Sequence, residues 1–180
     1  MRIVSGLYRG RILQAPQSFK LRPTTDKAKE SLFNILNNEY DFDNIRILDL
    51  FAGIGSISFE SASRGCEYVV SVEKNSKHAR FIHIQKENLK IDTIHVVCQD
   101  VRLYLQMCDE SYDVIFADPP YELPWIDDLP GLIFQSSVVS HESVVIIEHS
   151  SQTSFEKHPQ FSHTRRYGKV HFSWFVSDKV

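Results

Sequence analysis

Residues 46–56 read Arg46-Ile47-Leu48-Asp49-Leu50-Phe51-Ala52-Gly53-Ile54-Gly55-Ser56, and they carry the clearest structural signal in the sequence. An apolar run rich in β-sheet formers ends in a carboxylate and gives way to two glycines, which predicts a buried strand, a tight turn and a helix start. Glycine suits such a turn because it adopts φ values that other residues avoid and lets the backbone approach a ligand. The free N–H groups of the following helix can then face that ligand. The stretch predicts a ligand-binding α/β turn, with a purely structural turn as the alternative.

Strand-like and helix-like patterns alternate along the rest of the chain. Such alternation predicts a parallel sheet with helices on both faces. The segments 161–166 and 170–176 differ, because they flank Tyr167-Gly168-Lys169 and predict an antiparallel hairpin. The expected fold is therefore Rossmann-like α/β, with a mostly parallel seven-stranded sheet. The remaining strands are expected near 46–50, 67–72, 93–98, 112–117 and 143–149, and helices near 56–64, 75–89, 100–107 and 126–136.

The composition excludes several classes of protein. At 180 residues, 42% hydrophobic and 24% charged, the chain fits one globular domain with a small appendage. No run approaches the ~18 apolar residues of a membrane span, and the first residues lack the apolar core of a signal peptide. Three cysteines without a C-x-x-C pair favour a reduced, cytoplasmic protein. The eight histidines form no recognisable ligand cluster, so no metal is expected, and His78 and His83 are expected to be exposed on a helix.

Positive charge is concentrated at the N-terminus. Residues 1–30 hold seven Lys or Arg against two acids, whereas the other 150 hold thirteen against twenty-one. The segments 2–4 and 11–13 flank Gly6 and Gly10, which predicts an N-terminal β-hairpin extension. A basic arm on an acidic body is typical of a segment that contacts phosphate, although a solvated basic face is the alternative. We expect residues 1–22 to form this arm and residues 23–180 the main domain, whose first helix begins at the capping cluster Thr24-Thr25-Asp26 and runs to about residue 38.

Acidic residues follow three successive strands of the predicted sheet. Ligands of open α/β sheets bind at the carboxyl ends of the strands. Glu73 follows Gly53 by 20 residues, the spacing of a carboxylate that binds ribose hydroxyls. Asp100 can accept an adenine amino hydrogen while Val101 packs against the ring, although a lone acid there is more often a helix cap. Together with Asp49, these residues predict an adenosine-containing cofactor.

The fourth strand is followed by Asp118-Pro119-Pro120-Tyr121. An exocyclic amine is a poor nucleophile because its lone pair is delocalised into the ring, and Asp118 with the Pro119 carbonyl could accept its two N–H bonds. The two prolines stiffen the loop, and Tyr121 offers a face on which a flipped base can stack. The alternative is a capped turn with a surface tyrosine. In a site for an adenosine cofactor, the loop predicts methyl transfer to an amine.

These motifs resemble the S-adenosylmethionine-dependent amino-methyltransferases. The segments Met1 to Arg11 and Leu21 to Asn34 resemble, more specifically, the RsmD family of bacterial 16S rRNA guanine-N2 methyltransferases. The resemblance implies the methyltransferase variant of the Rossmann-like fold, S-adenosylmethionine as cofactor, and 16S rRNA or the small ribosomal subunit as partner of a cytoplasmic monomer. It also implies that Arg22 to Asp26 help to close the cofactor pocket. Lys27 and Lys29 stand where the family usually has arginines, and Ser5 where it has glycine. Lysine keeps the charge but loses the bidentate fork, so a phosphate contact at these positions would be weaker or different.

The predicted site has three groups of residues. Other amine methyltransferases, acting on adenine N6 or a protein amide, remain alternatives, because the tetrapeptide orients several amines. An NAD-dependent oxidoreductase is disfavoured because Ser58 replaces the third glycine of the dinucleotide fingerprint, and a non-catalytic RNA-binding module would not need Glu73 or Asp118. The catalytic residues are predicted to be Asp118, Pro119, Pro120 and Tyr121; the cofactor-binding residues Thr24, Asp26, Asp49, Phe51, Gly53, Gly55, Glu73, Lys74, Asp100, Val101 and Asp118; and the RNA-binding residues Arg2, Tyr8, Arg9, Arg11 and Arg22.

Overall fold

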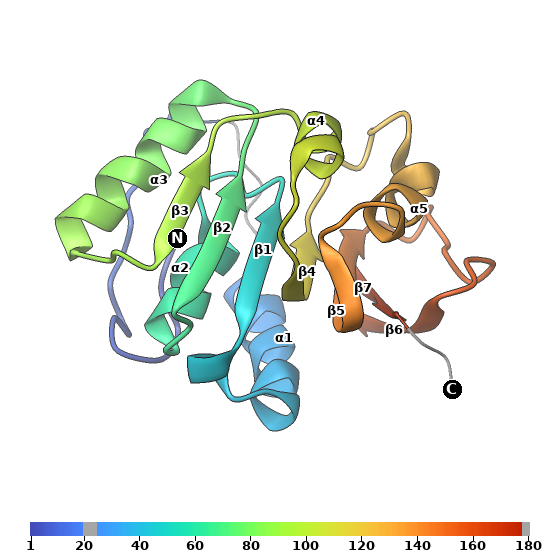
Figure 1. The fold of residues 1–180 in the computed structure, drawn as a ribbon. Helices are drawn as coiled ribbons and strands as arrows, with labels where there is room; N and C mark the ends of the chain where they lie inside the picture. Colours follow the sequence, from blue (N-terminus) through green and yellow to red (C-terminus); the bar gives the residue numbers. More distant parts are fainter. Residues whose placement is uncertain (20–24, 178–180) are drawn as a thin grey trace.

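A seven-stranded twisted sheet forms the centre of the protein (Figure 1). The computed structural model describes residues 1–19 and 25–177. The strand order is β3-β2-β1-β4-β5-β7-β6. The first five strands of the chain run parallel, and β7 pairs antiparallel with both β5 and β6, which confirms the predicted sheet and closing hairpin. The strands are β1 (Arg46–Leu50), β2 (Tyr68–Val72), β3 (Ile94–Val97), β4 (Tyr112–Ala117), β5 (Val139–His149), β6 (Phe161–Tyr167) and β7 (Val170–Val176).

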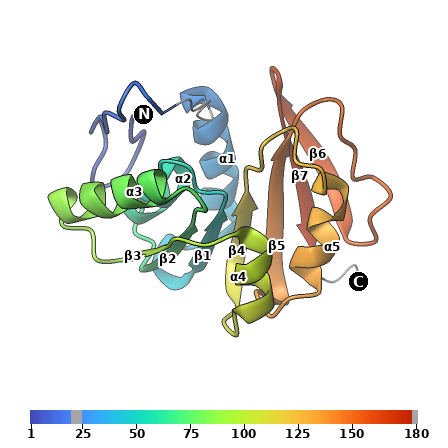
Figure 2. The same ribbon diagram turned by 90° about the horizontal axis from the view of Figure 1, so that it is seen from above.

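Helices cover both faces of this sheet (Figure 2). Side chains of α1, α2 and α3 pack into a core on one face, and those of α4 and α5 pack into a second core on the other. The helix predicted for 126–136 is divided into a short 3-10 helix and α5, with Pro130 at the start of the latter, where a missing N–H costs little. The helices are α1 (Asp26–Glu39), α2 (Ser56–Ser63), α3 (Ser76–Leu89), α4 (Val101–Met107) and α5 (Leu129–Phe134), with 3-10 helices η1 (Phe42–Asn44) and η2 (Ile126–Asp128).

The N-terminal arm, residues 1–19 in the described part of the chain, contains a short form of the predicted β-hairpin. Its two limbs are joined by an antiparallel bridge between Arg2 and Ile12. In addition, Ile3 N donates to the Arg11 carbonyl at 3.0 Å, and Leu13 N donates to the Met1 carbonyl at 2.9 Å. The pairing stays short because backbone N–H groups of residues 4–8 donate to α2 instead of to an opposite strand. Leu7 N donates to the Ser63 carbonyl at 2.7 Å, and the next residue's N–H donates to the Ser63 hydroxyl. The arm is thus a short hairpin whose turn region docks on α2, and it lies beside α1 and α3 in Figure 2.

A buried carboxylate on α2, Glu60, holds the arm in place. Its side chain is 0% exposed and accepts hydrogen bonds from Val4 N at 2.7 Å, Ser5 N at 3.0 Å and Arg64 Nε at 2.9 Å. Lys29 Nζ of α1 lies 3.7 Å from the same carboxylate and donates to the Arg2 carbonyl at 2.6 Å. Burial lowers the pKa of Lys29, and the charge of Glu60 partly offsets this effect. The arm, α1 and α2 therefore share one buried network.

We expect Glu60→Ala to destabilise the fold strongly. Removing one partner of a buried ion pair leaves the other charge uncompensated, which costs roughly 3–5 kcal/mol. The free energy of unfolding, measured by urea denaturation, should fall by about this amount. Glu30→Ala, which removes an exposed acid of α1, should change it by less than about 0.5 kcal/mol. Equal effects of the two substitutions would contradict the role of Glu60.

Candidate active site

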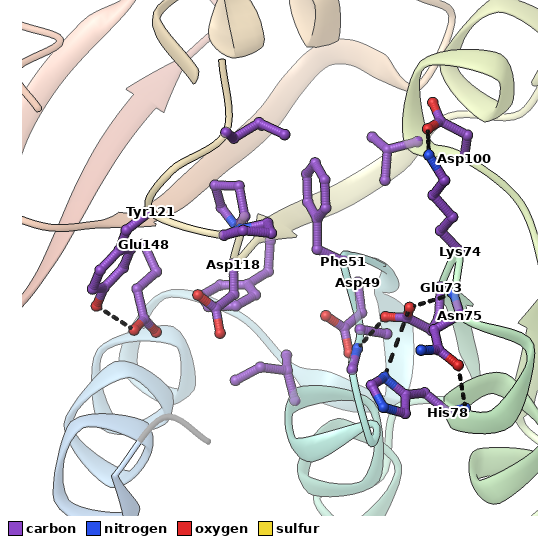
Figure 3. Close-up of a pocket in the computed structure, with 18 of the residues that line it drawn as sticks. Asp49, Phe51, Glu73, Lys74, Asn75, His78, Asp100, Asp118, Tyr121 and Glu148 are labelled. Carbon is purple, nitrogen blue, oxygen red and sulfur yellow. Dashed lines mark hydrogen bonds and ion pairs between the residues drawn. The ribbon is translucent and has the colours of Figure 1, made fainter. Parts of the chain in front are cut away.

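A cavity of about 1190 Å³ opens at the carboxyl ends of the parallel strands (Figure 3). This is the position that ligand sites take in open α/β sheets. The structure brings together most of the predicted site residues, and the cavity is lined by Asp49, Phe51, Gly53, Glu73, Lys74, Asp100, Val101, Asp118, Pro119, Pro120 and Tyr121.

Several predicted site residues lie elsewhere. Gly55 and Asp26 are not among the described residues that line the cavity. The Asp26 carboxylate accepts a hydrogen bond from Arg2 Nε at 3.1 Å. Thr24 and Arg22 lie outside the described residues. Their predicted roles stay predictions.

The turn after β1 is shaped by residues with positive φ and by the carboxylate of Asp49. Phe51 and Gly55 have φ values of 60° and 80°, and only the glycine adopts such a value without strain. Asp49 Oδ2 accepts hydrogen bonds from Ser58 N at 3.1 Å and Ser58 Oγ at 2.5 Å. The Ser58 hydroxyl also lies 2.6 Å from Ser71 Oγ of β2. Ser58, where a dinucleotide site has glycine, therefore fixes Asp49 to the start of α2.

Burial gives Asp49 an unusual protonation equilibrium. The side chain is buried, and loss of hydration raises its pKa to about 7, even though the hydrogen bonds from Ser58 favour the ionised form. The negative charge of Glu73 contributes to this rise of the pKa.

Glu73 connects the first two turns of the site. Its Oε2 accepts a hydrogen bond from Gly53 N at 2.8 Å, and its Oε1 accepts one from Asn75 N at 2.6 Å. His78 Nδ1 lies 3.9 Å from Oε1. His78 lines the cavity and is half-buried, so its predicted exposure was wrong, whereas His83 is exposed as predicted. The predicted ribose-binding carboxylate is thus held by backbone donors at the cavity wall.

Asp100 is both a helix cap and a residue of the cavity wall. It caps α4 by accepting a hydrogen bond from Arg102 N at 3.0 Å, and it lines the cavity. Partial burial alone would raise its pKa, but the hydrogen bond from Lys74 Nζ at 3.0 Å and that from Arg102 N outweigh burial and lower it. Asp100 is therefore ionised near neutral pH.

An aromatic wall in the cavity was not predicted from the sequence. The rings of Phe51 and Trp125 lie 6.0 Å apart, and the Arg102 guanidinium carbon lies 4.9 Å from the Trp125 ring centroid. All three residues line the cavity. The wall forms because the loop after β4 returns over the turn after β1, an approach that no local sequence pattern indicates.

The Asp118–Tyr121 loop is tied to two neighbouring strands. Asp118 N donates to the Leu50 carbonyl at 3.3 Å, which joins the loop to β1. The Tyr121 hydroxyl donates to Glu148 Oε1 at 3.3 Å, which joins it to β5 (Figure 3). Glu148 also lines the cavity and was not predicted, although its place near the end of an expected strand was a usable signal.

Metal sites and membrane-spanning helices can also be assessed for the described residues. No group of three or more His, Cys, Asp or Glu side chains in residues 1–19 and 25–177 could hold a metal ion. In the same residues, no helix is long and apolar enough to cross a membrane.

The chain is similar over nearly its whole length to a defined protein family. The family described as conserved hypothetical protein 95 matches residues 1–176. Ribosomal RNA small subunit methyltransferase D of Haemophilus influenzae is 31% identical over 152 residues, which cover 82% of this chain and 78% of that protein. This chain belongs to the RsmD family.

Two further similar proteins agree with this assignment. YlbH of Bacillus subtilis, named provisionally as an rRNA methyltransferase, is 34% identical over 157 residues, or 84% of each chain. The solved structure of a Thermus thermophilus protein of hypothetical status has a TM-score of 0.86 and 27% identity, and the match covers 98% of this chain and 99% of that one. The predicted family and fold are confirmed, and membership of the RsmD family disfavours both the oxidoreductase and the non-catalytic module.

We expect Asp49 to make the stability of the RsmD-family fold depend on pH. Because its folded-state pKa of about 7 exceeds the ordinary 3.8, the folded state binds more protons between these values, and the contribution of Asp49 to stability falls as pH rises from about 4 to 7. The difference in unfolding free energy between wild type and Asp49→Asn, followed by urea denaturation, should change by up to about 4 kcal/mol over this window. A difference independent of pH would contradict the raised pKa.

Proposed function

We propose that this RsmD-family protein transfers a methyl group from S-adenosylmethionine to the exocyclic N2 amine of a guanine in 16S rRNA. The observation that carries the proposal is the presence of the Asp118–Tyr121 loop in one cavity with the three strand-end carboxylates. Relatives named ribosomal RNA small subunit methyltransferase D support rRNA as the substrate. The guanine N2 target is our inference from the family resemblance and the amine-binding loop.

The cavity suits S-adenosylmethionine together with a flipped base. Its volume of about 1190 Å³ exceeds the roughly 300–1,000 Å³ of most small-molecule pockets. Glu73 would accept the ribose hydroxyls, and Asp100 with Val101 would hold the adenine. The positive-φ turn after β1 lets the backbone approach the rest of the cofactor. When bound, the cofactor supplies an electrophilic methyl group on a sulfonium.

The residues of the loop after β4 would orient the amine for attack. Asp118 and the Pro119 carbonyl accept its two N–H bonds, so that the nitrogen lone pair faces the donor. Tyr121 stacks on the base, and its hydroxyl bond to Glu148 fixes the ring. Holding donor and acceptor in line can supply roughly 7–11 kcal/mol of the barrier. The chain contributes mainly positioning.

The N-terminal arm would contact the RNA backbone. Arg9 and Arg11 are exposed, and the Arg2 side chain is 57% exposed although it pairs with Asp26. We assign residues 1–22 to RNA contact, with Tyr8 and Arg22 in that surface, and residues 23–180 to the methyltransferase domain. Lys29 is excluded from phosphate contact because its side chain is only 1% exposed. The protein would act in the cytoplasm as a monomer on 16S rRNA or the small subunit.

We expect Asp118→Ala to lower the rate of methyl transfer by several orders of magnitude. Contacts made mainly in the transition state affect rate more than ground-state binding, so cofactor affinity by calorimetry should change little. Asp118→Asn should also be slow, because its NH₂ can face the donors of the amine. The assay is single-turnover transfer of labelled methyl to 16S rRNA or small subunits, followed by mapping of the modified nucleotide.

The matched control for these variants is Asp127→Asn, which changes an exposed acid of η2 and should keep the wild-type rate. A near-normal rate for folded Asp118→Ala would refute the amine-orienting role. Modification of adenine, or of no rRNA nucleotide by the wild-type protein, would refute the proposed target.

The RNA-binding role of the arm is best tested by removing charge. Truncation would also delete Ile3 and Leu13, which are buried in the core. We expect Arg9→Gln/Arg11→Gln to weaken RNA binding and to reduce the slope of log affinity against log salt by up to about 2, roughly 1 for each phosphate that the arm no longer neutralises. Cofactor affinity should be unchanged. Lys157→Gln, an exposed charge after β5, is the control, and an unchanged slope in the arm variant would make the arm a structural element only.

A further inference from the structure

A second carboxylate lies beside Asp118 at the reacting end of the cavity. Glu148 belongs to β5, is 4% exposed and lines the cavity. Ala117 of β4 is in parallel register with Ile147 of β5. Asp118 and Glu148 are the residues that follow this pair, so they lie at the same level of the sheet, and Figure 3 shows the two side chains next to each other.

The loop itself helps to orient Glu148. The Tyr121 hydroxyl donates to Oε1 at 3.3 Å, which couples the stacking residue to this carboxylate. An ionised carboxylate accepts about four hydrogen bonds, so this bond is compatible with acceptance of further donors from a substrate. Burial makes each such bond selective, because a ligand atom that cannot donate leaves a buried acceptor poorly satisfied.

Guanine and adenine differ in the hydrogen-bond donors on their Watson–Crick edges. Enzymes that flip a base recognise it by hydrogen bonds to its Watson–Crick edge. Guanine presents three N–H bonds there, two on N2 and one on N1. Adenine presents two on N6, but its N1 is a lone pair, which a carboxylate would repel. Three neighbouring donors require a third acceptor besides Asp118 and the Pro119 carbonyl.

We infer that Glu148 is a specificity-determining residue that accepts the N1–H of the target guanine. This inference rests on the proposed function and deepens it, because Asp118 alone would hold the amine of either purine. The pair of acids at the ends of β4 and β5 thereby selects guanine against adenine. Tyr121 positions both the base, by stacking, and Glu148, by its hydroxyl.

The test uses 16S rRNA fragments in which the target guanine is replaced by 2-aminopurine. This base keeps the N2 amine but has a lone pair at N1. The ratio of single-turnover methylation rates, guanine over 2-aminopurine, is measured for the wild-type protein and for Glu148→Gln, whose amide can donate to N1. We expect the ratio to fall roughly ten- to hundredfold in Glu148→Gln, in line with the discrimination of one good base contact. Glu142→Gln, an exposed acid of the same strand, should keep the wild-type ratio.

Unfolding curves establish that the Glu148→Gln variant is folded, and calorimetry establishes that it binds S-adenosylmethionine. An unchanged ratio in that variant would overturn the inference. Equal methylation of the two bases by the wild-type protein would overturn it without any variant. Both outcomes leave rRNA methylation intact, whereas failure of the wild-type protein to methylate any guanine of 16S rRNA would overturn the proposed function itself.

Discussion

The buried carboxylate of Glu60 is the constraint on which the arrangement of arm and active site depends. Lys29 bridges from this carboxylate to the Arg2 carbonyl and, at 3.4 Å, to the hydroxyl of Ser56. Ser56 begins α2 and lines the cavity. A buried ion pair adds little net stability compared with apolar residues of the same size. When every polar atom in such a network is hydrogen-bonded, however, the surrounding segments can adopt few other arrangements. The N-terminal arm is thereby held at a fixed position relative to the turn after β1.

Close backbone approach strengthens the same connection. Gly6 has a φ of 80°, and a Cβ on it would lie 1.7 Å from the Ser63 carbonyl oxygen, so no other residue fits. The glycine expected to make a hairpin turn therefore permits docking on α2. A turn residue in the sequence indicates that the chain bends, but not which surface it bends against. For this reason the hairpin was predictable from its glycines, whereas its docking on α2 was not.

The strands were predictable because the central ones are buried on both faces and consist mostly of apolar residues. The expected bounds of β1 and β4 are those observed. The strand β5 begins at Val139, before the expected start at 143. This early start was missed because the residues from Ser140 to Glu142 are polar and at least partly exposed, so they lack the apolar pattern of a buried strand. The strand-end acids were found from a rule of topology. Their partners were not, since the bond from Gly53 N to Glu73 joins two turns whose distance no periodicity encodes.

The cavity residues that were not predicted from the sequence depend on the order of the strands in the sheet. The same order sets where the acidic side chains lie in the cavity. Trp125 and Glu148 enter the cavity only because β4 lies between β1 and β5 and its loop crosses to both neighbours. This order places the ionised Asp100 at the end of the cavity near β3, and Asp118 with Glu148 at the other. Asp49 lies between them, and its pKa of about 7 leaves about half of its carboxyl groups neutral at pH 7. A site rich in acids can thus remain folded while presenting acceptors to an amine at one end and to a nucleoside at the other.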